Sequence, residues 1–161
     1  MARATHNGTC PICGAKQAVN PKTGKLANHG YSVWWNSHNG TCRGSHKLPI
    51  EVDKDFALST AKSLEAEANQ LRHDAEHKEI TQVTETRGGD YGFQDYMVGR
   101  DEFQGSKYHG DIDRQWNLAC EKARKEMIER ADAIERSISR IFWRIENYYG
   151  QPLIKRNQGA A

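Results

Sequence analysis

Three cysteines near the N-terminus have the spacing of metal ligands. Cys10 and Cys13 are separated by two residues in the segment CPICG, so both thiolates can reach one ion. Gly14 follows directly and gives the backbone the freedom to close the turn and to direct its amides at the sulfurs. Cys42 is the third candidate ligand. Because structural zinc sites fill all four tetrahedral positions with Cys and His, the sequence predicts one structural Zn²⁺ with a histidine as its fourth ligand.

Three histidines could supply this fourth ligand. His29 lies where a short β-hairpin could return it to Cys13, because residues 20–24 (NPKTG) have the composition of a tight turn. His46 forms a Cys-x3-His pair with Cys42, which is also a suitable local chelate. On spacing and ligand chemistry we favour His29 over His46, and His46 over His38.

The same cysteines could instead form disulfides in a secreted protein. The first ten residues, MARATHNGTC, contain no apolar run, so we expect no signal peptide. No apolar stretch approaches the roughly 20 residues that a membrane helix needs. These features predict a cytoplasmic location, where reducing conditions favour zinc binding over a disulfide.

A longer motif follows CPxCG: a His-Gly-Tyr, then Gly-x-Cys-x-Gly, then a Pro two residues before a Glu. The matching residues are Cys10, Pro11, Cys13, Gly14, His29, Gly30, Tyr31, Gly40, Cys42, Gly44, Pro49 and Glu51. This constellation resembles small zinc-binding proteins of bacteriophages and mobile genetic elements, in which a helical region follows. The resemblance favours His29 as the fourth ligand and implies a bacterial host cell, but it implies no known activity.

Charge is divided unevenly along the chain. Residues 1–50 contain six Lys or Arg and no Asp or Glu, whereas residues 51–161 contain 17 basic and 21 acidic residues. Three thiolates and one Zn²⁺ would change the formal charge of the first segment from +6 to +5. Such a segment suits an anionic partner, either nucleic acid or an acidic protein surface.

Residues 1–50 are expected to form a small β-rich zinc module built on a zinc-ribbon-like hairpin. Residues 16–19 and 25–28 are predicted strands on either side of the turn, and residues 31–35 form a third. Successive strand residues face opposite sides, so we expect one of Trp34 and Trp35 in the core and the other on the surface.

Residues 51–150 are expected to form a long, coiled-coil-like antiparallel helical hairpin, because two apolar seams follow heptad spacing. The first helix, capped by Asp53 or Asp55, has the seam Ala57, Ala61, Leu64, Ala68, Leu71 and Ala75. The second spans residues 113–149, and its seam is Trp116, Cys120, Ala123, Met127, Ala131, Ile134, Ile138, Ile141, Ile145 and Tyr148. The predicted fold is therefore mainly α with a small β module, and residues 151–161 form a polar tail.

Two regions offer apolar surface for further contacts. The Ile-rich end of the second helix carries more than an Ala-rich partner helix can cover, which indicates docking on the zinc module or dimerisation. The connection at residues 80–110 contains six glycines and five aromatic residues. Disordered linkers rarely contain so many aromatic residues, so we expect this segment to pack on its own helices or on a partner.

The sequence predicts binding and no enzymatic activity. The zinc module has no Asp or Glu to act as a base, and the chain has no phosphate-binding loop or nucleophile motif. We favour binding to a protein complex of the host or phage, and the resemblance suggests an anti-defence or host-takeover role. The alternative is a DNA- or RNA-binding module with a dimerising arm. The candidate partner-binding residues are Trp34, Trp35, Lys16, Lys22, Lys25, Arg43, Lys47, Tyr91, Phe93 and Tyr96.

Overall fold

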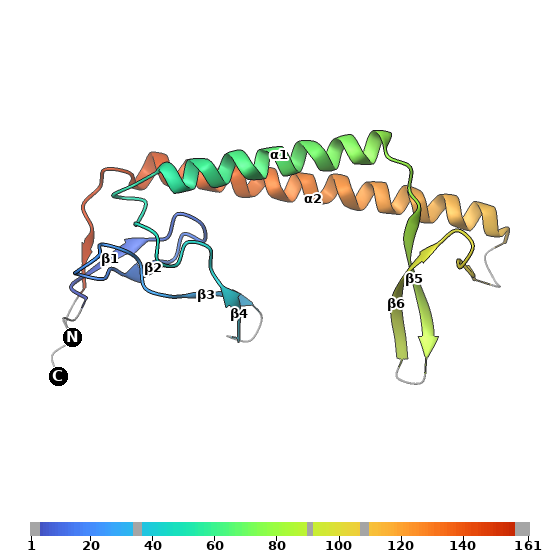
Figure 1. Cartoon of the computed structure of the whole chain (residues 1–161), viewed down its shortest axis with the longest axis horizontal. Coiled ribbons are helices and arrows are strands. Elements are labelled where there is room, and N and C mark those ends of the chain that lie inside the picture. The colour runs from blue at the N-terminus through green and yellow to red at the C-terminus, as the bar shows by residue number, and fades with distance from the viewer. Residues whose placement is uncertain (1–3, 34–36, 90–91, 107–109, 157–161) are drawn as a thin grey trace. The chain divides into compact units, whose positions relative to one another are not determined.

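The computed structural model describes residues 4–33, 37–89, 92–106 and 110–156, and it contains small antiparallel sheets and two helices (Figure 1). Two compact units are present: unit 1 is Met1–Leu64 with Arg136–Ala161, and unit 2 is Glu65–Glu135. The boundary between the units falls inside both helices. Neither of the described helices is both long and apolar enough to span a membrane.

Unit 1 contains a three-stranded sheet in the order β2-β1-β7 (Figure 1). The central strand β1 (His6–Thr9) pairs antiparallel with β2 (Lys16–Ala18) and with β7 (Ile154–Lys155). The sequence predicts a polar tail for the residues of β7, whereas the structure pairs them with the edge of β1 that β2 leaves free. The pairing continues past the strand, since Arg156 N donates to Thr5 O at 2.9 Å.

Residues 25–28 do not form the strand predicted beside residues 16–19. Leu26 makes a single bridge to Val19, and the turn at residues 20–24 is closed by Asn20 N donating to Lys25 O at 2.8 Å. On its other side, Leu26 contacts the turn at residues 42–47, because Leu26 N donates to Lys47 O at 2.8 Å. This segment therefore bridges two turns, and the unit differs from a simple hairpin.

A second small sheet joins β3 (Gly30–Val33) to β4 (Ser37–Thr41). Its register shifts between Gly30 and Ser32, which marks an irregularity next to His29. Trp34, Trp35 and Tyr91, which the sequence suggested as contact residues, lie outside the described residues.

The helices α1 (Asp55–His77) and α2 (Ile112–Tyr148) begin at aspartate caps. Asp53 Oδ1 accepts from Asp55 N at 2.8 Å, and Asp111 Oδ1 accepts from Asp113 N at 3.4 Å. Gly150, with φ of 78°, follows the end of α2 in the left-handed conformation common at helix C-termini. Every residue of the two predicted apolar seams is buried or half-buried.

Each unit has its own contacts between the helices. In unit 1, Ile50, Ala57, Ala61 and Ile141 form one buried cluster. In unit 2, Arg72 forms ion pairs with Asp132 at 2.9 Å and Glu135 at 2.7 Å. Also in unit 2, Arg124 Nη2 donates to Lys78 O at 3.4 Å. Arg72 of α1 thus pairs with Asp132 and Glu135, while Lys78, just after α1, contacts the earlier Arg124 of α2, so the two segments run antiparallel within this unit.

Residues 80–110 contain a regular hairpin of β5 (Gln82–Gly89) and β6 (Gly92–Gly99). Val83, Val98 and Phe103 form its buried base, and the ring of Phe103 meets Trp116 edge-on at 5.5 Å between centroids. The connection between the helices thus packs on α2 within unit 2.

A buried carboxylate anchors this hairpin. Burial alone would raise the pKa of Glu85, but hydrogen bonds from Arg87 and from the backbone amides of Gly105 and Gln104 outweigh it and hold the pKa below its ordinary value. Arg87 also lies over the ring of Tyr96 at 5.7 Å, so Tyr96 has a structural contact.

The buried alanines of α1 provide a test of close helix packing. Ala61 and Ala68 are each 2% exposed. We expect Ala61→Leu and Ala68→Leu each to lower the free energy of unfolding by about 1–3 kcal/mol, because extra methylenes overpack a filled core. Thermal unfolding followed by circular dichroism would measure this change.

The matched control is Ala66→Leu, on the exposed face of the same helix. It should leave the melting temperature unchanged or raise it slightly, since leucine is also a good helix former. Equal melting temperatures for all three variants would contradict close packing at Ala61 and Ala68.

Candidate metal centre

The first ligand loop is a tight turn at Cys10–Gly14. Gly14 N donates to Cys10 O at 3.0 Å, and Ile12 N donates to Cys10 Sγ at 3.4 Å. Gly14 has φ of 76°, a left-handed conformation that strongly favours glycine. The backbone thus presents an amide to the sulfur, as expected from the CPxCG spacing.

The second ligand loop is the turn at Cys42–Lys47. Gly44 N donates to Cys42 Sγ at 3.5 Å, and Ser45 N donates to Cys42 O at 2.9 Å. A Cβ atom at Gly44 would lie 2.2 Å from Cys10 Sγ, so only glycine allows the two loops to approach this closely. Steric fit, more than backbone conformation, therefore explains this glycine.

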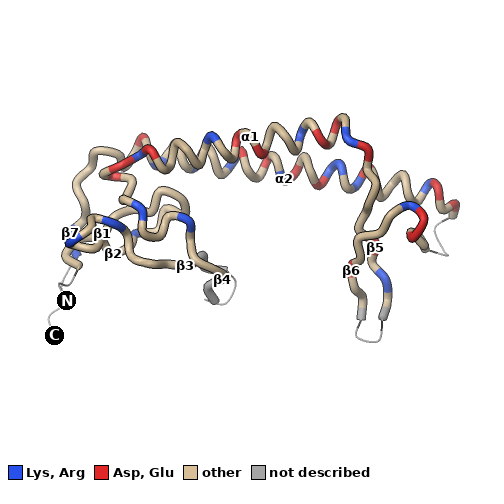
Figure 2. Tube along the Cα trace, in the orientation of Figure 1, with Lys and Arg blue, Asp and Glu red and all other residues tan. Residues whose placement is uncertain are grey.

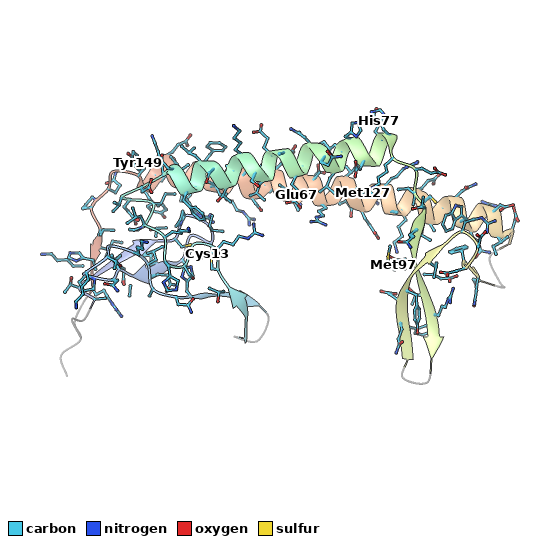
Figure 3. All side chains as sticks on the ribbon, viewed as in Figure 1. Cys13, Glu67, His77, Met97, Met127 and Tyr149 are labelled. Carbon is cyan, nitrogen blue, oxygen red and sulfur yellow. The ribbon has the colours of Figure 1, made fainter. Side chains whose placement is uncertain are left out.

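The two loops and His29 bring four ligand atoms together. One atom each from Cys10, Cys13, His29 and Cys42 lies within 4.8 Å of all the others, an arrangement that could hold a metal ion. Cys10 and Cys42 are buried, and Cys13 and His29 are half-buried. The side chain of Cys13, labelled in Figure 3, belongs to this cluster.

Two separations between ligand atoms agree with a tetrahedral zinc site. With Zn–S bonds of about 2.3 Å and Zn–N bonds of about 2.0–2.1 Å, tetrahedral geometry places two sulfurs about 3.8 Å apart and a sulfur and a nitrogen about 3.6 Å apart. The observed separations are 3.8 Å between Cys10 Sγ and Cys42 Sγ and 3.5 Å between Cys13 Sγ and His29 Nε2. The donor set, three thiols and one imidazole, is that of structural zinc sites.

The imidazole of His29 is oriented by its neighbours. Its Nδ1 lies 3.0 Å from Ala27 O and 3.2 Å from Ser45 Oγ, so a proton on Nδ1 has acceptors and Nε2 is left to face Cys13. Ser45 Oγ also accepts from His29 N at 3.1 Å and donates to His29 O at 3.0 Å. This buried serine fixes the histidine and was not identified from the sequence.

The other candidate histidines lie elsewhere. His46 is exposed and lines a separate cavity, and the side chain of His38 is outside the described side chains. The remaining cysteine, Cys120, packs beside Val83, Val98 and Phe103 in unit 2, where burial raises the pKa of its thiol.

Burial of the ligands has an electrostatic consequence. It raises the pKa of the Cys10 thiol to about 12, because low-dielectric surroundings disfavour an isolated thiolate. A bound cation supplies the opposite charge that such a thiolate requires. The four clustered ligand atoms could hold such a cation.

An arginine from α2 supports the first ligand loop. Arg144 Nη1 donates to Ile12 O at 2.6 Å, and Nη2 donates to Cys13 O at 3.4 Å. A Cβ atom on Gly14 would lie 2.5 Å from Arg144 Nε, so the guanidinium packs directly against the loop. Sequence analysis missed this residue because 130 positions separate it from Gly14 and no local pattern marks it.

The predicted partner-binding residues within the described part of the chain are exposed. Lys16, Lys22, Lys25, Arg43 and Lys47 all lie on the surface of unit 1. Phe93 is 84% exposed and Tyr96 is 44% exposed on the hairpin of unit 2. Met97, labelled in Figure 3, is 62% exposed there too and was not among the predicted residues.

Comparison of the chain with protein-family models, curated proteins and solved structures finds no match.

Substitution of single histidines would identify the fourth ligand. We expect His29→Ala to lose bound metal as severely as Cys42→Ala, since each removes one of four clustered ligand atoms. His46→Ala should keep its metal because His46 is not part of the cluster. Elemental analysis of freshly purified variants would measure the metal-to-protein ratio, and loss of metal from His46→Ala with retention by His29→Ala would contradict the assignment.

Proposed function

We propose that the protein is a non-enzymatic binding protein whose N-terminal part is held by one structural zinc ion and whose basic unit binds nucleic acid. The Cys3His donor set supports zinc, since its four ligands leave no open coordination position for a substrate. The cluster contains no carboxylate that could serve as a general base. The N-terminal part would then be a variant zinc-ribbon module.

We further propose that α1 and α2 pair along their length as one antiparallel hairpin. The buried cluster around Ala61 and Ile141 in unit 1 supports this arrangement. The antiparallel contacts in unit 2 support it independently, since the ion pairs of Arg72 lie on the same helices.

The segregation of charge is the observation that favours nucleic acid. Unit 1 contains 13 Lys or Arg and four Asp or Glu, a formal charge of +9. Unit 2 contains 10 Lys or Arg and 17 Asp or Glu, a formal charge of −7. Figure 2 marks these residues along the chain. A binding site for a polyanion therefore has to be sought on unit 1.

The fold strengthens this charge beyond what the first 50 residues provide. Strand β7 adds Lys155, and Arg156 follows it in contact with Thr5. Three arginines at the end of α2, Arg136, Arg140 and Arg144, belong to unit 1 as well. One of the four acidic residues, Glu51, is buried and accepts from Thr9 N at 2.9 Å, so it contributes little negative surface.

A salt series would test this proposal. Anisotropy of a fluorescein-labelled single-stranded oligonucleotide should report binding that weakens steeply with salt. The double variant Lys155→Gln/Arg156→Gln should lower the slope of log K against log salt by about 0.7 for each phosphate interaction that it removes.

The matched control is Lys122→Gln/Lys125→Gln in unit 2, where both lysines are exposed and pair with glutamates one turn ahead. It removes the same charge and should leave the slope unchanged. Equal slopes for wild type and both variants, or no binding at low salt, would count against the proposal.

Binding to a protein is the second candidate, and the hairpin of unit 2 supports it. Phe93 and Met97 lie on one face of β6, in line with Thr84 and Gly88 of β5, and both are largely exposed. The charge of −7 on this unit would repel nucleic acid, so a basic, apolar protein surface suits it better. The resemblance to mobile-element proteins agrees with a host complex as the target.

Variants of the exposed hairpin residues would test this second function. Phe93→Ala/Met97→Ala should abolish capture of the host proteins that the wild-type chain retains, because both side chains are largely exposed and their truncation leaves the buried base of the hairpin intact. Tyr96 is avoided since it contacts Arg87. Leu118→Ala on α2, at 54% exposure in the same unit, serves as the control. Quantitative capture by Phe93→Ala/Met97→Ala equal to that of wild type would contradict the role of the hairpin.

A further inference from the structure

A cavity of about 440 Å³ opens on unit 1 between the turn at residues 20–24 and the second ligand loop. Its polar lining residues are Asn20, Thr23, Lys25 and His46, and the other described residues around it are small or apolar. No Asp or Glu is among the lining residues that the structure describes. The cavity therefore differs chemically from a cation site.

The four polar residues can all donate hydrogen bonds into the cavity. Asn20 Oδ1 already accepts from Lys22 N at 2.9 Å and Thr23 N at 3.3 Å, which leaves its NH₂ group as a donor. Thr23 Oγ1 accepts from Lys25 N at 3.4 Å, which leaves its hydroxyl proton available. Lys25 contributes an ammonium group, and an imidazole has at least one N–H in every protonation state. A site that offers hydrogen-bond donors and no acceptors suits an oxyanion, which only accepts hydrogen bonds.

The backbone of His46 supplies a second observation. It is the only non-glycine residue with positive φ in the described part of the chain, at 60°. A left-handed conformation is unfavourable for a residue with a side chain, and glycine would satisfy the same turn without strain. Two backbone hydrogen bonds hold His46 in this conformation: His46 N donates to Leu26 O at 3.1 Å, and Lys47 N donates to Gly44 O at 3.3 Å. The turn itself does not require a side chain at this position, so the histidine serves to place an imidazole at the cavity.

We propose that this cavity is an oxyanion subsite that accepts one phosphate group of a bound nucleic-acid backbone, with Lys25 and His46 as its principal ligands. This inference rests on the proposed nucleic-acid function. The metal centre has a part in it, because Ser45, which holds His29, directly precedes His46 in the second ligand loop. The metal-held turn would thereby place the imidazole opposite the turn that carries Lys25.

The first experiment uses inorganic phosphate as the probe on the metal-loaded protein. In ¹H–¹⁵N correlation spectra at constant ionic strength, phosphate should shift the amides of Thr23, Lys25 and His46 and should saturate. Chloride at the same ionic strength should not produce these shifts. Lys25→Gln should abolish saturation, whereas Lys22→Gln, in the same turn but not lining the cavity, should retain it.

The second experiment separates a binding role of His46 from a structural one. His46→Gly should raise the melting temperature, because glycine relieves the strain at φ of 60°, and should keep its bound metal. The same variant should weaken oligonucleotide binding by about tenfold, as expected for loss of a hydrogen bond to a charged group. A structural role alone would change stability without changing affinity.

The outcomes distinguish this subsite from the proposed function. Equal oligonucleotide affinity in Lys25→Gln and Lys22→Gln, or unchanged affinity in His46→Gly, would overturn the subsite while nucleic-acid binding stands. Saturable phosphate binding without oligonucleotide binding would support an oxyanion cavity and would contradict the nucleic-acid function. Absence of saturable phosphate shifts in the wild type would overturn the subsite outright.

Discussion

The Cys10, Cys13, His29 and Cys42 cluster is the constraint on which unit 1 depends. The buried hydrophobic residues around it are few: Val19 and Leu26, with two of the ligands themselves as the remainder of the buried cluster. With only the partly buried Ile12 and Leu153 beside them, these residues do little to offset the conformational entropy of ordering the two ligand loops and the short strands. A metal ion joining three separate segments would supply the missing stabilisation, since in small modules metal binding and folding are coupled.

The same centre is linked to the helical part of unit 1 by specific contacts. Arg144 binds the carbonyls of the first ligand loop, and Glu51 accepts both the amide and the hydroxyl of Thr9, which directly precedes Cys10. Ile50, beside Glu51, enters the buried cluster with Ala57 and Ile141. The ends of α1 and α2 in this unit therefore pack on segments whose positions the ligand loops fix. The surplus apolar surface at the end of the second helix predicted docking on the zinc module or dimerisation, and these contacts join that end to the module within unit 1.

The sequence predicted the features that have a long repeating pattern, such as the helices, or a characteristic ligand spacing, such as the first ligand loop. Heptad spacing located both helices to within about two residues, and CxxC spacing with Gly14 located the first ligand loop. Short strands such as β1 and β7 were missed because two to four residues carry no detectable alternation, and the pairing partner of β7 is distant in sequence. The hairpin of unit 2 was missed because the buried Glu85 interrupts the apolar alternation of β5, and only the contact with Arg87 explains its burial. The choice among the histidines needed tertiary contacts, since Ser45 and Ala27 orient His29.

The strained and charged features of unit 1 surround the ligand cluster and are not part of it. The cluster itself consists of Cys10, Cys13, His29 and Cys42, and backbone amides donate to Cys10 Sγ and Cys42 Sγ. The unusual features lie just outside it: a strained His46, a carboxylate-free cavity and basic side chains from both ends of the chain. Strained backbone persists only where surrounding structure enforces it, and here the enforcing element is the ligand loop. A metal ion bound to the cluster would thus fix the loop that positions His46.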